Sequence, residues 1–301
     1  MNYRDGVLFL FLAAIWGPAY TAIKVGLEHL PPVFFAALRY DVAAVLMVTY
    51  CILAVDYWRP TTYRDILTVV TSGVLIIAGY NAFLFTGEQG TSSATAAIIV
   101  TLVPVLTTVF ASVLLRDEGL SLDGWIGLAV AFGGVTLIIG PSEVGGGSGL
   151  LYPGLILIAS ISISTGTVLT RFIGTTIPNE TMTAWSMLVG AVVLHATSFV
   201  TGESVAPGSL PLDIIYPLLY LGVVASALAF VIYFSLLERV GAIEINMVAY
   251  AAPVFASLTG FILLGEQPTL FTFGGYFLIF VGFIFVQNSR SGIAGKYVDF
   301  G

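Results

Sequence analysis

Residues 103–138 read VPVLTTVFASVLLRDEGLSLDGWIGLAVAFGGVTLI, and residues 252–286 read APVFASLTGFILLGEQPTLFTFGGYFLIFVGFIFV. Each stretch holds a hydrophobic run with a proline, a polar turn with a glutamate, and a second hydrophobic run rich in glycine. Pro104 and Pro253 lie 149 residues apart, and three further pairs lie 148 apart: Glu118/Glu266, Gly127/Gly275 and Gly134/Gly282. Four landmarks in one order indicate a tandem duplication of about half the chain.

The composition is that of a membrane protein. The chain has 301 residues, of which 58% are hydrophobic and 9% are charged, whereas soluble domains carry about 25% charged residues. Ten segments approach the length of about 20 mainly apolar residues that crosses a bilayer. They are residues 6–27, 32–55, 66–87, 92–115, 122–140, 152–173, 180–201, 214–237, 242–264 and 270–288. Because backbone groups in lipid must be hydrogen-bonded within their segment, we expect an all-α polytopic membrane protein with ten transmembrane helices.

The duplication and the spans together divide the chain into four parts. We expect a first five-helix repeat over residues 1–140, a Gly-rich linker over 141–150, a second five-helix repeat over 151–289 and a tail over 290–301. The linker includes the sequence PSEVGGGSG, whose composition is typical of a flexible connection.

Basic residues are confined to one side of the predicted bundle. Lys24 and Arg39 fall inside spans, and the other eight precede the first span or follow an even-numbered one: Arg4, Arg59, Arg64, Arg116, Arg171, Arg239, Arg290 and Lys296. The opposite side has no Lys or Arg and holds Glu28, His29, Glu88, Glu143, Glu203, Asp213 and Glu266. The positive-inside rule therefore predicts a multi-pass protein of the plasma membrane with both termini in the cytoplasm.

Five spans in each half give the duplication a particular symmetry. Because five is odd, the second half begins on the opposite side of the membrane from the first. The two halves are then inverted-topology repeats, an arrangement common in secondary transporters, where it places a substrate site near the bilayer midplane.

Two predicted helices carry a polar face that includes a proline. At 100° per residue, the fourth span places Thr101 and Pro104 on one face, and the ninth places Asn246, Tyr250 and Pro253 on one face. We interpret these faces as walls of a substrate cavity, with both prolines bending their helices for gating. Helix packing through small and hydroxyl residues is the alternative interpretation.

The first span contributes a second set of candidate substrate contacts. Trp16, Tyr20 and Lys24 share one helix face, and Asn81 adds a polar group at membrane depth in the third span. An ammonium within the membrane needs a partner or a wet cavity, which makes Lys24 a functional candidate. The alternative is that Lys24 extends to the outer interface.

Three further polar residues lie inside predicted spans. Arg39 and Asp41 face opposite ways on the second span, because two residues turn a helix by 200°. We expect Arg39 to reach the outer interface and Asp41 to neutralise Lys24 or Arg39. The alternative for Asp41 is titration in a proton-coupled cycle. For His195 we expect a packing or interfacial role rather than catalysis.

Several function classes lack their sequence signals. Seventeen acidic residues against ten basic ones give a net charge of −7, which argues against a nucleic-acid partner. The sequence contains no HExxH, GxSxG or GxxxxGK[ST] motif, so no hydrolase centre or nucleotide loop is predicted. Cys51 is the single cysteine and is interpreted as a small packing residue. We expect no catalytic residues, no metal and no cofactor.

The residues resemble the drug/metabolite transporter superfamily, in particular its ten-helix EamA-type permeases. WGPAYTAIK at 16–24 and FFAALRY at 34–40 are similar to the family's first and second helices, and both stretches quoted at the outset resemble the pattern that closes each half. This resemblance implies a central cavity lined by spans one, three, four, six, eight and nine, with spans five and ten more peripheral.

The function expected is secondary transport of small metabolites such as amino acids or related solutes, by alternating access around a midplane cavity. Export is the favoured direction. The expected partners are the small-molecule substrate and the lipid bilayer, and homodimer formation stays open. The alternatives are a channel, a lipid translocator or, less favoured, a membrane-embedded enzyme.

The topology predicts opposite labelling of two positions. A cysteine replacing Ser148 should react with an impermeant maleimide from outside the cell, and one replacing Ser291 should react only from the cytoplasmic side, because five spans separate them. The reagent is applied to intact cells and to inverted vesicles. Reaction of both positions from one side would contradict the predicted topology.

Overall fold

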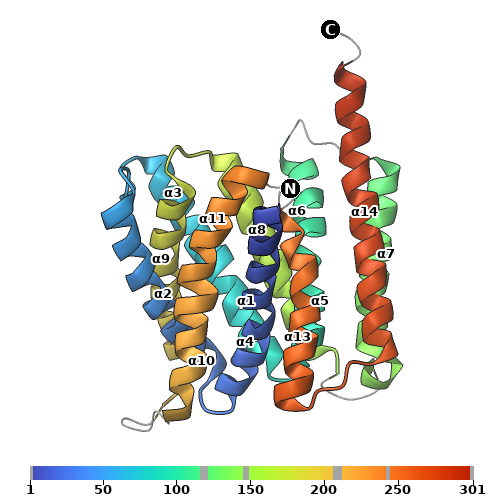
Figure 1. Cartoon of the computed structure of the whole chain (residues 1–301), viewed down its shortest axis with the longest axis horizontal. Coiled ribbons are helices and arrows are strands. Elements are labelled where there is room, and N and C mark those ends of the chain that lie inside the picture. The colour runs from blue at the N-terminus through green and yellow to red at the C-terminus, as the bar shows by residue number, and fades with distance from the viewer. Residues whose placement is uncertain (1–2, 116–120, 145–148, 206–211, 242–244, 299–301) are drawn as a thin grey trace.

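The computed structural model describes residues 3–115, 121–144, 149–205, 212–241 and 245–298, and regular structure in these residues is helical throughout (Figure 1). Within these described residues, nine helical stretches are long and apolar enough to cross a membrane: Tyr3–Leu27, Pro32–Ala54, Tyr63–Glu88, Ser93–Leu114, Leu122–Ile139, Leu151–Ile173, Asn179–Val200, Leu212–Val240 and Leu270–Asn288. A shorter apolar helix covers Val248–Leu264. The protein is an all-α polytopic membrane protein, as the sequence predicts.

Most of the helices match single predicted spans. They are α1 (Tyr3–Leu27), α2 (Pro32–Ala54), α7 (Leu122–Val144), α8 (Leu151–Ile173), α9 (Asn179–Val200), α13 (Val248–Leu264) and α14 (Leu270–Val298). Two helices exceed their predictions: α7 continues four residues into the expected linker, and α14 continues through most of the expected tail. The turn at Arg116–Gly119, with Glu118, and residues 145–148 lie outside the described residues.

Three spans are interrupted instead of being single α-helices. The fourth consists of α5 (Ser93–Val100) and α6 (Val103–Leu114), separated at Thr101–Leu102. The third consists of α3 (Tyr63–Ser72), the π-helix η1 (Gly73–Gly79) and α4 (Tyr80–Glu88). The eighth consists of the 3₁₀ turn η2 (Leu212–Ile214), α10 (Ile215–Leu219), the π-helix η3 (Tyr220–Leu228) and α11 (Ala229–Val240).

The two prolines predicted to bend helices occupy different settings. Pro104 stands in the first turn of α6, where its missing N–H breaks no helical hydrogen bond. Thr101 and Leu102 instead donate to carbonyls three residues back, which tightens the chain at the break. Pro253 lies inside the continuous helix α13. The helix is therefore interrupted beside Pro104 in the first copy, while the chain around Pro253 in the second copy stays helical. Bending for gating stays a prediction at both prolines.

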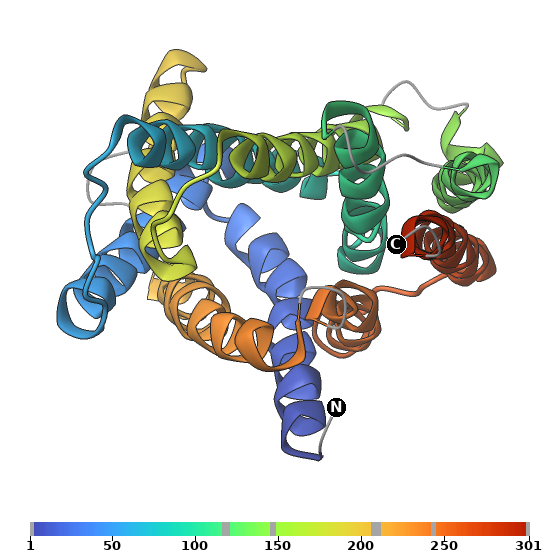
Figure 2. The ribbon, with the colours of Figure 1, turned by 90° about the horizontal axis from the view of Figure 1, so that it is seen from above.

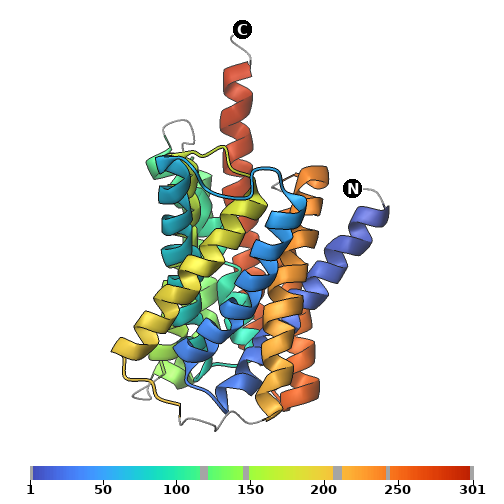
Figure 3. The ribbon, with the colours of Figure 1, turned by 90° about the vertical axis from the view of Figure 1, so that its left-hand side faces the viewer.

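The remaining helices surround α1 as a bundle, with α7 and α14 paired at one side (Figure 2). In Figure 3, α1 crosses the bundle at a slant, and α14 extends beyond the other helices. The helix contacts recur in the two halves. The pairs α2 with α9 and α7 with α14 each join matching helices. In addition, α1 packs on α13 where α8 packs on α5 and α6, and α4 packs on α8 where α11 packs on α1. Spans five and ten are peripheral, as the family resemblance implies.

Glycines determine how closely α7 and α14 approach. A Cβ on Gly134 would lie 2.6 Å from the carbonyl oxygen of Gly275, and one on Gly127 would lie 2.6 Å from that of Gly282. Real Cβ atoms do not approach so closely, so only glycine allows the two backbones to cross here. The glycine pairs that revealed the duplication therefore form this helix contact.

Adding one methyl group to this contact should destabilise the protein. Gly134→Ala should lower the free energy of unfolding by about 1–3 kcal/mol, because the methyl overpacks a backbone contact. Gly133→Ala is the matched control, since a Cβ there meets nothing within 4 Å, and helix propensity should leave it neutral or slightly stabilising. Thermal unfolding of both purified variants measures the difference. Equal stabilities would contradict the packing described.

Candidate functional site

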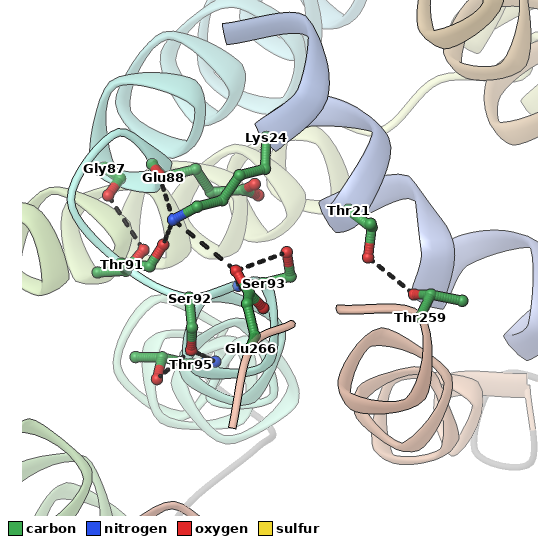
Figure 4. A network of polar contacts seen from close by, with 10 residues as sticks. All are labelled: Thr21, Lys24, Gly87, Glu88, Thr91, Ser92, Ser93, Thr95, Thr259 and Glu266. Carbon is green, nitrogen blue, oxygen red and sulfur yellow. Dashed lines mark hydrogen bonds and ion pairs between the residues drawn. The ribbon is translucent and has the colours of Figure 1, made fainter. Parts of the chain in front are cut away.

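A polar cluster joins four spans at the end of the bundle where α1 stops (Figure 4). Lys24, in the last turn of α1, donates from Nζ to the carbonyl oxygen of Thr91 and, at 3.4 Å, to that of Glu88. Its Nζ also lies 3.8 Å from Glu266 Oε1. Lys24 is therefore held by partners from the α4–α5 turn and from the segment after α13. We call Lys24, Glu88, Thr91, Ser93 and Glu266 the Lys24 cluster.

Glu266 reaches this cluster because of the way α13 ends. Gly265 adopts the left-handed conformation, with φ +67°, and the N–H of Glu266 donates to the carbonyl of Gly260 at 3.1 Å. This is a Schellman-type helix end, which turns the next residue back over its own helix. A Cβ on Gly260 would lie 2.4 Å from Glu266 Oε2, so this glycine leaves room for the carboxylate.

The Glu266 carboxylate lies at the N-terminus of α5. The backbone N–H of Ser93 donates to Oε2 at 2.9 Å and to Oε1 at 3.1 Å. Free N–H groups and the helix dipole both favour an anion at this position. Glu266 thus joins the end of α13 to the start of α5, while its ion pair with Lys24 adds α1.

The carboxyl group of Glu88 is buried beside these charges. Glu88 is the last residue of α4 and is 0% exposed. Neither of its carboxyl oxygens has a hydrogen-bond partner among the described residues, although the charges of Lys24, Glu266 and Arg39 act on it. The sequence placed Glu88 among the acidic residues of the outer side, and its burial is a finding of the structure.

Below the Lys24 cluster, α1 and α13 are in direct contact. The hydroxyl oxygens of Thr21 and Thr259 lie 2.7 Å apart. One turn further along α1, a Cβ on Gly17 would come within 2.5 Å of the Ala252 carbonyl oxygen. Small residues thus bring the first and ninth spans together, as the packing interpretation of the ninth span proposed.

Deeper in the bundle, a second cluster surrounds Arg39, which is 8% exposed. Its Nε donates to Ser226 Oγ at 3.1 Å, and its Cζ lies 5.2 Å from the Tyr40 ring centroid and 6.0 Å from that of Phe85. Asn81 Nδ2 donates to Tyr40 Oη at 3.0 Å. We call these five residues the Arg39 cluster. The prediction that Arg39 reaches the outer interface is wrong, because rings and a hydroxyl hold the guanidinium inside.

The aromatic residues of α1 contact the eighth and third spans. Trp16 Nε1 donates to the carbonyl of Ala225, inside η3, at 3.1 Å, and its ring packs against Phe230 and Tyr233. A side-chain hydrogen bond joins Tyr20 to Tyr80. In the other half, Ser162 donates to the Leu75 carbonyl inside η1 at 2.8 Å. Both π-helices therefore accept a side-chain hydrogen bond from the helix that begins the opposite half.

The structure does not bring all the predicted site residues together. Trp16, Tyr20, Lys24 and Asn81 lie in or beside the two clusters. Thr101 is 1% exposed and donates to the carbonyl of Ile98 at 2.6 Å, at the break between α5 and α6. Its hydrogen bond therefore stays within its own span.

The predicted arrangement of the ninth span is wrong. Its sequence suggested one helix from 242 to 264, but the helical ladder is interrupted at Met247, so Asn246 lies before α13 and is exposed rather than mid-span. The Tyr250 ring packs 5.7 Å from Phe280 and 4.6 Å from Phe283 of α14, measured between centroids. Tyr250 thus faces the peripheral helix, away from the partners of Trp16.

Asp41 and His195 form a pair of their own. Asp41 Oδ2 lies 2.8 Å from His195 Nε2, with side chains 46% and 40% exposed. The expected pairing of Asp41 with Lys24 or Arg39 is therefore wrong, because α2 packs against α9 along this face. His195 has the packing role that the sequence favoured, here against a charged partner.

An apolar groove lies apart from both clusters. It has a volume of about 460 Å³ and is lined by Trp58, Arg59, Pro60, Ile66, Val69, Val70, Trp185 and Val189. Trp58, Arg59 and Pro60 lie in the connection between α2 and α3, and the other residues belong to α3 and the first half of α9, at the end of the bundle opposite to Lys24. The groove is therefore no part of the candidate site.

A helical membrane bundle with a buried guanidinium and a charged cluster at one end fits a solute transporter. Comparison with known proteins agrees: the model of the EamA-like transporter family matches the chain twice, over residues 4–140 and 151–287. The chain belongs to the EamA-like transporter family, as its sequence motifs indicate.

Individual relatives are likewise transporters of unstated substrate. An uncharacterized transporter of Archaeoglobus fulgidus is 25% identical over 287 residues, covering 95% of this chain and 100% of the relative. The uncharacterized inner membrane transporter YedA of Escherichia coli is 32% identical over 265 residues, covering 87% and 83%. A solved structure, described only as the crystal structure of a protein, shares the fold, with a TM-score of 0.66, 17% identity and coverage of 97% and 99%.

The packing of Tyr250 predicts how its variants behave. Tyr250→Ala should lower stability by roughly 3–5 kcal/mol, because a large buried ring is removed. Tyr250→Phe should be neutral or slightly stabilising, because the hydroxyl is buried with no hydrogen-bond partner among the described residues. Unfolding temperatures and transport per folded molecule are measured on the same samples. Loss of transport in Tyr250→Phe at full stability would show that the hydroxyl contacts substrate.

Proposed function

We propose that the protein is a secondary transporter of small zwitterionic metabolites such as amino acids, working by alternating access between two inverted five-helix repeats. Its two repeats, residues 1–140 and 151–289, would have both termini in the cytoplasm and lie in the plasma membrane. The double family match and the paired helix contacts support the repeats.

One observation carries the choice of substrate. Arg39 is buried in the first half of α2, and the hydrogen bond that the structure gives its guanidinium is from Nε; within the described residues, its Nη groups make none. Such a guanidinium can bind a carboxylate with two parallel hydrogen bonds. Buried unpaired charge is costly, so an anionic ligand is the natural partner.

A neighbouring group would receive the other end of an amino acid. Asn81 Oδ1 is a buried acceptor with no hydrogen-bond partner among the described residues, and its Nδ2 joins the Arg39 cluster through Tyr40. An amide oxygen accepts from a substrate ammonium, while Trp16 and Tyr20 offer aromatic faces for cation–π or apolar contact. Donor, acceptor and rings together match a zwitterion better than a lipid or an inorganic ion.

The Lys24 cluster would act as the outer closure of this site. It joins the first, third, fourth and ninth spans through two carbonyls, one ion pair and one helix N-terminus. Both α1 and α13 pack on α5, whereas α8 packs on both α5 and α6. The break at Thr101–Leu102, where α5 and α6 meet, would serve as the hinge. With its outer end closed, the transporter would load from the cytoplasm, and we therefore propose export.

Counterflow in proteoliposomes tests the function. Vesicles loaded with an unlabelled amino acid should transiently concentrate the labelled one, which a carrier does and a channel does not. Arg39→Gln should reduce counterflow by roughly 10–100-fold, the effect of losing a charge-assisted hydrogen bond of about 1.5–3 kcal/mol. Rates are expressed per folded molecule.

Tyr250→Phe serves as the control variant, since it changes a tyrosine outside the proposed site. It should retain wild-type counterflow. Absence of counterflow across a panel of amino acids, or an undiminished rate in Arg39→Gln, would refute the proposed substrate class. A flux that does not saturate would instead indicate a channel.

A further inference from the structure

The Lys24 cluster holds more carboxyl groups than cations. The carboxyl groups of Glu88 and Glu266 both lie near a single ammonium group, that of Lys24. Glu266 takes the ion pair with Lys24 and the backbone N–H of Ser93 in α5. Lys24 meets Glu88 through the backbone carbonyl of Glu88, and the Glu88 carboxyl has no hydrogen-bond partner among the described residues.

In the part of the chain that the structure describes, Lys24 and Arg39 are the cations that act on Glu88, and both have other partners. From α1, Glu88 faces Lys24 and Tyr20, from α2 Arg39, and from the segment after α13 Glu266. Tyr80 lies on its own span, and Tyr152 of α8 packs against the neighbouring Gly87 and Gly90. Arg39 is held by Ser226 and its two rings. An isolated carboxylate at full burial is strongly disfavoured, whereas the neutral acid is tolerated.

We propose that Glu88 is a proton-binding site of the transport cycle and that closing the outer end of the bundle takes up one proton there. In the closed arrangement Lys24 pairs with Glu266, and Glu88 is a neutral acid. When the outer end opens and α13 carries Glu266 away, Lys24 loses its counterion. The O–H bond of Glu88 then breaks, the proton passes to water, and Lys24 neutralises the new carboxylate.

This inference rests on the proposed function in one respect, namely that the outer end opens and closes. The direction of the pH effect follows from which state holds the proton. The closed state carries one proton more than the open state, so lowering the pH favours closure and raising it favours opening. For one proton, the ratio of closed to open molecules changes by up to about tenfold per pH unit.

The test is a distance measurement that does not depend on transport. Spin labels replace Thr201, where α9 ends, and Leu263, near the end of α13 and 68% exposed, in a Cys51→Ala background reconstituted in nanodiscs. Double electron–electron resonance gives the population of short and long distances between pH 5 and 9. In the otherwise wild-type protein, the long-distance population should grow as the pH rises.

Two variants separate Glu88 from other acidic groups. Glu88→Gln should hold the short distance at every pH, because the amide cannot ionise. Asp213→Asn is the matched control, since Asp213 is an exposed carboxylate near the same end of the bundle, and it should keep the wild-type pH response. A wild-type distribution that is independent of pH, or an unchanged pH response in Glu88→Gln, would overturn the proposal.

Infrared spectroscopy of the wild type covers the case in which Glu88→Gln fails to fold. A buried neutral acid gives a carboxyl C=O stretching band that should fade as the long-distance population grows, and Glu88→Asp should shift it. Absence of the band at low pH would overturn the proposal. Counterflow without any pH-dependent distance change would leave the proposed transport standing while removing Glu88. A pH-dependent distance change without counterflow would leave the proton site at Glu88 standing and refute the proposed transport.

Discussion

The ammonium of Lys24 has to be neutralised where the ends of several helices meet, and much of the helix packing at that end depends on it. Within the described residues, its partners are Glu88, Thr91 and Glu266, which follow Lys24 by 64, 67 and 242 residues in the sequence. They reach it because Gly265 reverses the chain after α13 and Gly260 leaves space for the carboxylate. The Lys24 cluster is therefore assembled from both halves of the chain.

The π-helices give the inner site its hydrogen-bonding character. A π-helical segment is often found at functional sites, and here each one accepts a side-chain donor from the opposite half: Trp16 on η3 and Ser162 on η1. Ser226 of η3 also accepts from Arg39. The guanidinium is thus positioned by a backbone irregularity that has a counterpart in the other half. The two donors differ, so the two halves form a similar frame around an asymmetric site.

Much of the fold could be predicted from the sequence, because hydrophobic length and charge distribution act locally. The predicted spans agree closely with the helices. The glycines that match between the two halves also form the contact between α7 and α14, where Gly134 meets Gly275 and Gly127 meets Gly282. The site could be predicted only in part. Trp16, Tyr20, Lys24 and Asn81 carried a visible signal, namely polarity at membrane depth.

On the ninth span the prediction failed because helix faces follow from the sequence only when the helix is ideal and unbroken. The interruption of the helix at Met247 separates Asn246 from α13, and the Tyr250 ring packs against Phe283 of α14. The burial of Arg39 was not predicted, because its hydrogen-bond acceptor, Ser226, lies 187 residues away in the sequence. Glu88 resembled a loop residue because it stands at the end of a span. Its burial depends on how α4 packs, and no local pattern encodes that.

The central claim is that the contact between α1 and α13 must open for solute to cross. Cysteines at positions 21 and 259, in a Cys51→Ala background, would replace two threonines whose hydroxyl oxygens lie 2.7 Å apart, close enough for a disulfide after small adjustment. Oxidation should abolish counterflow, and reduction should restore it, with either single cysteine variant unaffected. If fully cross-linked protein transported as fast as the same protein with its disulfide reduced, the account would be contradicted.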